Sequence, residues 1–538
     1  MRSATRAVLT ILLGATVLSA ATVSIDLSTR YQTIEGFGAF MHISPWREKQ
    51  GPFYYDVDLD AVHIYDSVIS RLGVTMIRVF TDASFEADSG VYEVTGSGEF
   101  GMINQFKHMR KLKAAAERHG EPLEFIISVL SPPAYMKPSG QVVGGMEAAP
   151  NYYETDCRLK DGYDDEFARY LVNYLNVQKD STGIDMYALN IQNEPAFQEP
   201  YASCVYNGPR YTSVSKAVGQ ALEAAGIPTP LFGAEHMSWA FPNAFENHVR
   251  SDPDALKYFK AWAVHGYTDG NSADTGSYSG ATATDKAFWM TETSGSSFGA
   301  TTNGINDWPG AMTLARQIHG YLRNARMSAW VWYHLQSASS SGYATNTDGL
   351  IADTSFTAKA YVSQHFYRYI RPGARQVAST CDDNQVKVVA FYHEENDCYT
   401  LVFMNETSGP KTVNALNGAG LPSQWTLLVS TESAKVVEST VNTGQAFTLP
   451  ASSIATLVAG TYRGTPTIAS AKPPSATRGP VPAGFQLART QTYDLRGRLV
   501  SGNARMHILK TLAPAFYCRR SATGATTLSV PLNHTNGD

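Results

Sequence analysis

The stretch Leu123–Gln192 shows the pattern on which the fold assignment depends. Within it, the apolar run LEFIISVL (Leu123–Leu130) is followed by the amphipathic stretch DEFARYLVNYLN (Asp165–Asn176) and then by a second apolar run, MYALNIQ (Met186–Gln192). Short apolar runs that alternate with amphipathic stretches are typical of parallel strands connected by helices. We therefore predict a strand, a helix and a second strand in this stretch.

The same alternation extends from Ile34 to Ile370. The candidate strands are Ile34–Phe40, Thr75–Phe80, Leu123–Leu130, Met186–Gln192, Leu231–Ala234, Trp262–Tyr267, Ala287–Thr293 and Ala329–His334. A further amphipathic stretch, Ala311–Ala325, precedes the last of them. Eight parallel strands close a barrel. A doubly wound open sheet would also alternate, but it needs a Gly-rich phosphate loop, and none follows these runs. We expect an α/β fold, a (β/α)8 TIM barrel.

The chain outside the barrel has different patterns. After Pro372, period-two runs and Gly, Asn and Ser turns predict an all-β sandwich side domain. Thr22–Ser28 is strand-like and is expected to pair into that domain. The predicted divisions are 22–35 for the N-terminal strand, 36–372 for the barrel, 373–460 for the side domain, 461–484 for a Pro/Thr/Ser-rich linker and 485–538 for a basic C-terminal segment.

Composition and charge limit the possible classes. The chain has 538 residues, 43% hydrophobic and 17% charged, which allows a large core and excludes disorder for most of it. A net charge of −5 argues against a general nucleic-acid binder. From Thr461 onward there are 10 Lys and Arg but only 2 Asp and Glu, so the tail is basic. Its Tyr493–Arg498 motif (YDLRGR) resembles C-terminal sorting or anchoring segments on secreted enzymes of some Gram-negative bacteria. A surface-associated module and a poorly ordered extension are the alternatives.

The N-terminus is typical of an export signal. Arg2 and Arg6 precede the apolar run Ala7–Leu18, and small residues follow at 19–21. Residues 1–21 therefore match a secretory signal peptide, too short to span a membrane in the mature protein. We expect a bacterial protein that is secreted or at the cell surface, and a monomer.

Five cysteines are compatible with disulfides in an exported chain. Cys381 and Cys398 flank an expected hairpin, and Cys157 and Cys204 flank one strand, while Cys518 is left over. Pairing and free thiols are both open. No pair has zinc-ligand spacing, so we expect neither a metal nor an organic cofactor.

Two strands end in a carboxylate. The fourth candidate strand continues into Asn193 and Glu194, and the seventh contains Glu292. In such a barrel, reactive groups lie at the carboxyl ends of the strands. A single glutamate there is more often solvated or salt-bridged. Two glutamates on strands four and seven can approach to about 5 Å, the separation that a retaining glycosidase requires.

Several ordered motifs resemble those of glycoside hydrolase family 30. They are Ile34–Gly38 (IEGFG), Ser131–Lys137 (SPPAYMK), Asn193–Pro195 (NEP), Trp289–Glu292 (WMTE) and Arg368–Gly373 (RYIRPG). The resemblance extends from about Val23 to Ala459 and implies a (β/α)8 barrel with an attached β-sandwich. It also implies hydrolysis of β-linked glycans with retention, with Glu194 as the acid/base and Glu292 as the nucleophile. Within the family, these motifs are most similar to those of the secreted endo-β-1,4-xylanases.

Other residues are candidates for substrate binding or for support of the two carboxylates. Arg78, at the end of the second strand, is the candidate cation for Glu292, although an ordinary buried ion pair would give the same contact. Tyr267 is expected to donate a hydrogen bond to Glu292. His265 lies two residues before Tyr267, so both side chains point to the same face of the strand. A buried histidine with its hydrogen bonds satisfied in the core is nevertheless the more common case. By resemblance, Asn193 contacts the sugar 2-hydroxyl.

Aromatic side chains near strand ends suit a sugar substrate, because flat rings cover the apolar faces of pyranoses. The candidates are Trp332, which we expect to be a stacking platform, Trp46 and Trp239 in the groove wall, and Tyr135 and Tyr333. Each of them alone would more often be a core residue.

Two departures from the family affect the substrate. Glucuronate-dependent xylanases of this family have an arginine pair after strand eight, where this chain has Gln336 and Ser337. Without a guanidinium, a carboxylate branch loses its bidentate partner. The usual Trp before the Pro-Pro motif is also absent, since Val129–Ser131 occupies the positions before it. We expect a secreted retaining endo-β-glycanase acting on plant cell-wall polysaccharide: a β-1,4-xylanase independent of glucuronic acid, or alternatively a β-1,6-glucanase or β-1,6-galactanase.

Two other classes compete. Gly295–Gly299 fits the G-x-S-x-G pattern of esterases, with Ser297 as its nucleophile, but it lies in a Ser/Gly-rich loop. A non-catalytic glycan-binding protein would use the same groove without turnover.

Overall fold

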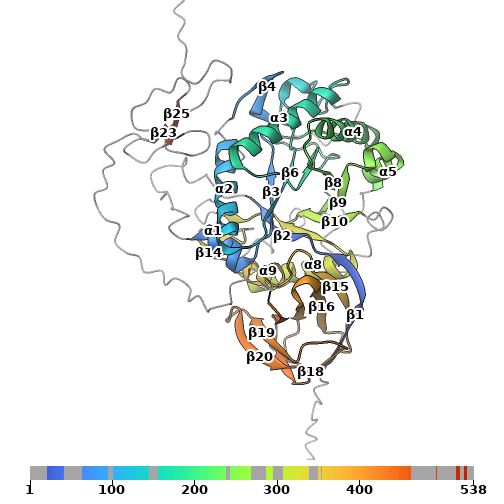
Figure 1. The fold of residues 1–538 in the computed structure, drawn as a ribbon, viewed down its shortest axis with the longest axis vertical. Helices are drawn as coiled ribbons and strands as arrows, with labels where there is room; N and C mark the ends of the chain where they lie inside the picture. The colour runs from blue at the N-terminus through green and yellow to red at the C-terminus, as the bar shows by residue number, and fades with distance from the viewer. Residues whose placement is uncertain are drawn as a thin grey trace, which may run out of the picture.

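The computed structural model describes residues 21–41, 63–94, 101–144, 155–237, 243–267, 286–294, 307–337, 349–352 and 354–461, and the short segments 492–493, 517–520 and 526–529. In Figure 1 the helices and strands of the barrel form one body, and the strands between residues 375 and 459 form a second body beneath it, together with the N-terminal strand β1 (Ala21–Thr33). The barrel body contains the polar site described below.

A closed barrel of parallel strands forms the first body, in the order β10-β11-β2-β3-β6-β7-β8-β9. These strands are β2 Gly36–Phe40, β3 Met76–Phe80, β6 Glu124–Ser128, β7 Ala188–Asn190, β8 Leu231–His236, β9 Phe259–His265, β10 Ala287–Glu292 and β11 Ala329–Trp332. Each lies within or overlaps one of the eight predicted runs. The predicted TIM barrel is confirmed.

Helices surround the barrel on its outer side (Figure 1). They are α1 Ile64–Asp66, α2 Met102–His119, α3 Asp164–Thr182, α4 Gly208–Ala224, α5 Asn243–Ser251, α6 Pro253–Leu256, α8 Trp308–Asn324 and α9 Ala358–Tyr367, with a π-helical turn η2 at Ser67–Leu72. The starts of the long helices follow from local sequence. Asn207 and Asp307 accept backbone N–H groups in the first turns of α4 and α8, and both helices begin with a proline in the first turn.

The second body is a nine-stranded sheet with the order β20-β19-β22-β17-β16-β15-β1-β18-β21. Its strands are β1 Ala21–Thr33, β15 Arg375–Cys381, β16 Val386–His393, β17 Cys398–Asn405, β18 Lys411–Asn417, β19 Gln424–Ser430, β20 Val437–Asn442, β21 Phe447–Leu449 and β22 Ser453–Ala459. The N-terminal strand β1 pairs antiparallel with β15 and parallel with β18. The predicted all-β side domain is therefore present, and the first strand of the chain belongs to it.

Side-chain alternation along β17 packs the sheet on both faces. Leu401 and Phe403 belong to the core of the side domain, whereas Val402 and Met404 belong to the barrel core. The barrel helices α8 and α9 form hydrogen bonds across this contact. Trp308 Nε1 of α8 donates to the Ser452 carbonyl at 2.7 Å, and the ring nitrogens of His365 in α9 lie 2.8 Å from the hydroxyl groups of Thr456 and Ser430. The side domain thus continues the hydrophobic core of the barrel.

Small elements complete the described fold. Near the barrel they are η3 Ala83–Phe85, β4 Glu86–Asp88, β5 Val91–Tyr92, η4 Ala134–Met136, β12 Gln336–Ser337, β13 Ile351–Ala352 and β14 Ser355–Phe356, and in the side domain η6 Glu394–Asn396. The tail contributes β23 Thr492–Tyr493, β24 Tyr517–Arg520 and β25 Thr526–Ser529, which pair as one antiparallel sheet. Residues 1–20 and most of the expected linker lie outside the described residues.

Four of the five cysteines have a thiol state that the structure describes. Cys157, Cys204, Cys381 and Cys398 are all free thiols, so neither of the two pairings that the sequence left open is present. Among the helices of the described residues, none combines the length and the apolar character needed to span a lipid bilayer.

Candidate active site

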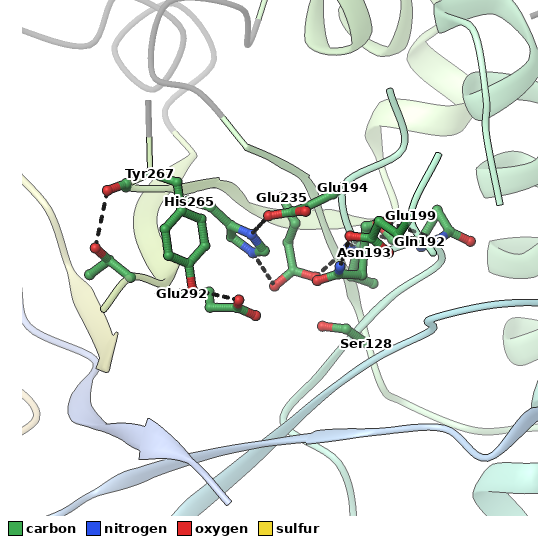
Figure 2. A network of polar contacts seen from close by, with 12 residues as sticks. Ser128, Gln192, Asn193, Glu194, Glu199, Glu235, His265, Tyr267 and Glu292 are labelled. Carbon is green, nitrogen blue, oxygen red and sulfur yellow. Dashed lines mark hydrogen bonds and ion pairs between the residues drawn. The ribbon is translucent and has the colours of Figure 1, made fainter. Parts of the chain in front are cut away.

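A buried polar network lies at the carboxyl ends of the barrel strands (Figure 2). Below it, the barrel interior is filled by apolar side chains, among them Met76, Ile126, Phe232 and Trp289. Polar side chains replace these apolar ones toward the carboxyl ends of several strands, as Asn190, Glu235, His265 and Glu292 do, so the site faces one end of a filled barrel.

Glu292 is the last residue of β10 and has two strong partners. Arg78 Nη1 lies 2.5 Å from its Oε2, and the Tyr267 hydroxyl donates to its Oε1 at 2.7 Å. Both contacts are those expected from the sequence. A cation and a hydrogen-bond donor on opposite oxygens therefore fix the orientation of this carboxyl group.

Glu194 follows β7 and is almost completely buried. Its backbone has φ of 44°, an uncommon conformation for a residue with a side chain, which strains the turn that carries it. Nδ1 of His265 lies 2.7 Å from its Oε1. Burial raises the pKa of Glu194, but the hydrogen bond and the charge of His265 outweigh burial, so the pKa falls below its usual value.

The two carboxylates face each other. Oxygens of Glu194 and Glu292 and a ring nitrogen of His265 all lie within 4.8 Å of one another. This spacing matches the separation of about 5 Å in retaining glycosidases and leaves no room for the intervening water of an inverting enzyme.

Arg78 lies in the middle of β3, not at the strand end that the sequence predicted, and it connects the residues of the site. Its buried guanidinium donates to Ser128 Oγ at 3.1 Å, to Asn193 Oδ1 at 2.7 Å and to Glu235 Oε2 at 3.0 Å, besides pairing with Glu292. Burial alone would lower the pKa of Arg78, but the charges of Glu235 and Glu292 raise it above its ordinary value. Arg78 therefore keeps its charge and fixes the amide of Asn193 beside the two carboxylates.

Glu235 is a site residue that the sequence analysis missed. It lies near the end of β8, is fully buried and receives Asn190 Nδ2 at 2.6 Å in addition to Arg78. Burial raises the pKa of Glu235, but the charge of Arg78 lowers it well below its usual range. The signal was available, because the strand ends Ala234-Glu235-His236 just as strand seven ends in Glu292.

His265 is the end of β9 and has a different role from an ordinary core histidine. It is fully buried, and its second nitrogen, Nε2, lies 3.6 Å from Glu235. Burial lowers its pKa, but the charge of Glu292 and the hydrogen bond to Glu194 raise that pKa to about 9. At neutral pH the ring is therefore an imidazolium between two carboxylates.

A second missed carboxyl group, Glu199, lies beside Glu194 in the loop after β7. It is fully buried, and its Oε1 receives the Tyr201 hydroxyl at 3.1 Å and Asn193 Nδ2 at 3.4 Å. The ring of Tyr201 is 52% exposed. Nothing in the sequence separates Glu199 from a solvated loop glutamate.

The SPPAYMK motif anchors this loop. Lys137 is fully buried, and its Nζ donates to the carbonyl oxygens of Ser203 at 2.6 Å and Val142 at 2.9 Å and to Ser131 Oγ at 3.3 Å. The ammonium group thus joins the loop after β6 to the loop that carries Glu199.

Tyr135, predicted from the sequence to bind substrate, is partly buried and has its hydroxyl in a polar cluster between α3 and β4. Its hydroxyl donates to Glu86 Oε1 and to Glu166 Oε1, both at 3.0 Å, within a cluster that also contains Arg169. The ring packs against the barrel core. Tyr135 therefore stabilises the contact of α3 with β4.

The prediction that Trp332 is a stacking platform is wrong. Trp332 is 1% exposed, belongs to the core cluster outside the barrel and lies under the ammonium of Lys359 from α9 at 5.5 Å. Side chains alternate along β11, so Ala329 and Val331 point inward while Trp332 points outward. The next residue, Tyr333, is only partly buried and stacks on Phe40 at 5.4 Å with the planes 10° apart.

Several expected features cannot be placed. Trp46, Trp239 and the Gly295–Gly299 pattern lie outside the described residues. Gln336 begins β12 and is buried, and the side chain of Ser337 is not described.

The spacing of Glu194, His265 and Glu292 is also one that a metal ion could use. Each of the three already has a protein partner, and the Arg78 guanidinium supplies the positive charge beside Glu292. The contacts are therefore those of an ion-pair network, and a metal is not needed to balance these carboxylates.

Comparisons with known proteins agree with this geometry. Residues 99–369 match the Glycosyl hydrolase family 30 TIM-barrel domain. Glucuronoxylanase XynC of Bacillus subtilis (strain 168) is 23% identical over 453 residues, which cover 83% of this chain and 93% of XynC. Putative glucosylceramidase 1 of Caenorhabditis elegans is 25% identical over 464 residues, 81% of this chain and 82% of the relative.

Solved structures show the same fold. The family 30 subfamily 8 xylanase Xyn30A from Clostridium acetobutylicum superposes with a TM-score of 0.64 at 22% identity, covering 82% of this chain and all of Xyn30A. The endo-β1,6-glucanase BT3312 gives a TM-score of 0.62 at 19% identity, covering 82% and 94%. With the barrel, the paired carboxylates and the matched domain, the chain belongs to glycoside hydrolase family 30 and is a retaining O-glycosyl hydrolase.

Proposed function

We propose that Glu292 is the nucleophile and Glu194 the acid/base of a secreted endo-β-glycanase that cleaves β-1,4-xylan without requiring glucuronic acid branches. The observation that carries this proposal is the approach of the two carboxylates to within 4.8 Å. The carboxylate of Glu292 attacks the anomeric carbon while Glu194 gives a proton to the departing oxygen. Glu194 then takes a proton from water, which releases the sugar from Glu292.

The surroundings of each carboxylate suit its role. Arg78 and Tyr267 each contact one oxygen of Glu292 and hold it in the fixed orientation that an attacking group needs. The pKa of Glu194 lies below its usual value, because the effect of His265 exceeds that of burial, and this suits the step in which Glu194 acts as a base. For the first step, Glu194 must obtain a proton.

The substrate proposal rests on the relatives and on one sequence position. XynC is a glucuronoxylanase by name, and Xyn30A is a xylanase. At the positions of the family's arginine pair, this chain has Gln336 and Ser337. A neutral amide cannot form the bidentate ion pair that holds a uronate, so unbranched xylan remains the matching substrate.

The second candidate is β-1,6-glucan. In place of an aromatic wall before the Pro-Pro motif, Leu130 packs with Phe40 and Phe80 in a small apolar cluster. BT3312, an endo-β1,6-glucanase, has a similar fold. A changed wall at this point alters which face of the sugar chain can pack there.

A polysaccharide panel tests the proposal. Purified protein is incubated with arabinoxylan, glucuronoxylan, β-1,6-glucan and β-1,6-galactan, and the products are resolved by chromatography and by proton NMR of the first anomer released. We expect oligosaccharides of several lengths from both xylans, with retained configuration, and activity at least about 10⁴-fold lower for Glu292→Gln. Cleavage of glucuronoxylan alone would refute the assignment based on Gln336.

Export is a further part of the proposal. The basic start, the apolar run Ala7–Leu18 and the small residues that follow support removal of residues 1–20 or 1–21. Mass spectrometry of protein from the culture medium should find a chain that starts at Ala21 or Thr22. Recovery of the activity only inside the cells, with the N-terminus intact, would contradict export.

A further inference from the structure

The carboxyl group of Glu199 has no role in the two-carboxylate mechanism, yet it lies in the centre of the site. It is fully buried and in hydrogen-bond contact with the carboxyl group of Glu194. In Figure 2 it lies on the side of Glu194 away from His265, next to Asn193. Two buried carboxyl groups in contact cannot both be charged without a large electrostatic cost.

The partners of Glu199 do not compensate a negative charge. Its Oε1 receives one hydroxyl, from Tyr201, and one long amide contact, from Asn193. Its Oε2 is buried, and no amide, hydroxyl or cation of the described residues donates to it. A buried oxygen without a donor is satisfied when it carries a proton itself. Burial, and then the contact with Glu194, raise the pKa of Glu199 to about 11.

The loop holds Glu199 rigidly in this position. The backbone N–H of Glu199 donates to Ser203 Oγ at 3.1 Å, and Ser203 Oγ donates to the Phe197 carbonyl at 3.0 Å. The carbonyl of Ser203 is the one that receives the buried Lys137 ammonium at 2.6 Å. The contact between the two carboxyl groups is thus fixed by the fold from two loops.

We propose that Glu199 is a positioning residue that holds, as a neutral carboxylic acid, the proton that Glu194 delivers to the departing oxygen. The inference rests on the proposed role of Glu194 as the acid/base. The Glu199 O–H bond breaks as an O–H bond forms on Glu194, and the charge moves to Glu199, where Tyr201 and Asn193 donate to it. After Glu194 has passed the proton to the departing oxygen, both carboxyl groups are charged, but Glu292 has lost its own charge in the ester bond, so the total charge of the site is unchanged. When Glu194 later takes a proton from water, that proton can return to Glu199, so the pair holds one proton before and after each turnover.

The charged and titratable groups around the pair come from every neighbouring strand end. They are Arg78, Glu235, His265, Tyr267 and Glu292 from the barrel, and Tyr201 from the same loop. The positive charges of Arg78 and His265 lie on the side of Glu194, so a lone Glu194 would be ionised. The proton must therefore be stored on the far carboxyl group.

The first experiment compares leaving groups. A dinitrophenolate leaves without a proton, whereas a sugar alcohol requires one. For Glu199→Gln we expect kcat/KM to fall at least about tenfold on xylohexaose and to change less than about threefold on 2,4-dinitrophenyl β-xylobioside. If the polysaccharide panel selects β-1,6-glucan, the matching gentio-oligosaccharide and aryl gentiobioside are used.

The matched control is Glu35→Gln. Glu35 precedes β2 at the other end of the barrel, and its carboxyl group likewise receives a tyrosine hydroxyl, from Tyr187 at 2.6 Å, and a second N–H, from Trp289 at 3.0 Å. This variant loses a partly buried carboxyl group, which also pairs with Lys260 at 3.1 Å, far from the reaction. We expect the same ratio of the two kcat/KM values as in the wild type.

The second experiment records pH profiles and stability. In the plot of kcat/KM against pH for xylohexaose, the basic limb of Glu199→Gln should lie about one pH unit or more below that of the wild type. The reason is that Glu194 without Glu199 loses its proton at a lower pH. Since the pKa of Glu199 is raised on folding, its burial costs stability above pH 4.5, so the melting temperature of Glu199→Gln relative to the wild type should increase from pH 4.5 to pH 7.

Equal losses on both substrates with an unmoved basic limb would show that Glu199 only packs, and would overturn the inference. Glu194→Gln separates this failure from that of the proposed function. If Glu194→Gln itself shows no dependence on the leaving group, the acid/base assignment is wrong. If Glu194→Gln shows the dependence and Glu199→Gln does not, only the inference about Glu199 fails.

Discussion

Nδ1 of His265 lies 2.7 Å from Oε1 of Glu194, and both side chains are almost completely buried. The pair belongs to an alternating arrangement in which Arg78 and His265 separate three carboxylates, on Glu194, Glu235 and Glu292. Such alternation offsets the cost of burying each charge, provided that all members are present. Each of the following changes removes one member or one supporting contact.

His265 should make stability depend on pH. Because its folded pKa, about 9, exceeds the ordinary 6.5, its charged form stabilises the fold fully below pH 6.5, and this contribution is lost as the pH rises through about 9. We expect His265→Asn to lower the free energy of unfolding by on the order of 3 kcal/mol at pH 6 and by much less at pH 9.5. Urea unfolding at both pH values measures this. A difference that does not change with pH would contradict a charged His265.

Tyr267 should contribute to catalysis through its hydroxyl group. Its hydrogen bond to Glu292 is one to a charged acceptor, worth about 1.5–3 kcal/mol, so Tyr267→Phe should lower kcat/KM by about 10–100-fold. Tyr258→Phe is the control, because Tyr258 donates to Glu223 at the same 2.7 Å on the exposed surface. Steady-state kinetics on the preferred polysaccharide give the comparison. A loss of similar size in both variants would disprove a specific role of Tyr267.

The RYIRPG motif should contribute to stability rather than to activity. Glu121 receives Arg368 Nη1 at 2.6 Å and also pairs with Arg371, and all three residues are buried. Replacing the carboxylate removes the negative charge that the two buried guanidinium groups share, so Glu121→Gln should lower the free energy of unfolding by about 3–5 kcal/mol. Chemical denaturation measures the loss, while kcat below the unfolding temperature should stay near that of the wild type. Unchanged stability would contradict this interpretation of the motif.

Substitution of Trp332 should affect stability, whereas substitution of Tyr333 should affect substrate binding. Trp332→Phe removes packing between β11 and α9, so it should lower the melting temperature and leave KM unchanged. Tyr333→Ala removes the aromatic ring that follows β11 beside Phe40, so it should raise KM for the polysaccharide. Thermal unfolding and steady-state kinetics on both variants test the pair. A raised KM for Trp332→Phe would restore the platform that the structure contradicts.

Local pattern predicted most of the barrel. Each strand run is a continuous apolar segment because both faces of a parallel barrel strand are buried, and each helix has an apolar stripe. Such signals are short-range, so the eight runs could be recognised one at a time. The position of Glu292 at the end of its run, and that of Arg78, followed from the same rule.

It was harder to predict which side chains at the end of a strand point into the barrel and which point outward. Trp332 and Tyr333 are neighbours in the sequence, and only their pairing within the barrel decides which one points outward. A shift of one residue exchanges the inner and outer faces of a strand, and composition does not reveal that shift.

The sequence alone determined the barrel, the side domain and the two carboxylates at strand ends, because each depends on the order of neighbouring residues. Only the tertiary structure decided that Glu199 joins them and that Glu235 and His265 pair with Arg78 and Glu194, since these residues come from different strands and loops. Their protonation depends on burial and on charges that lie within a few ångströms of one another only after the barrel has closed.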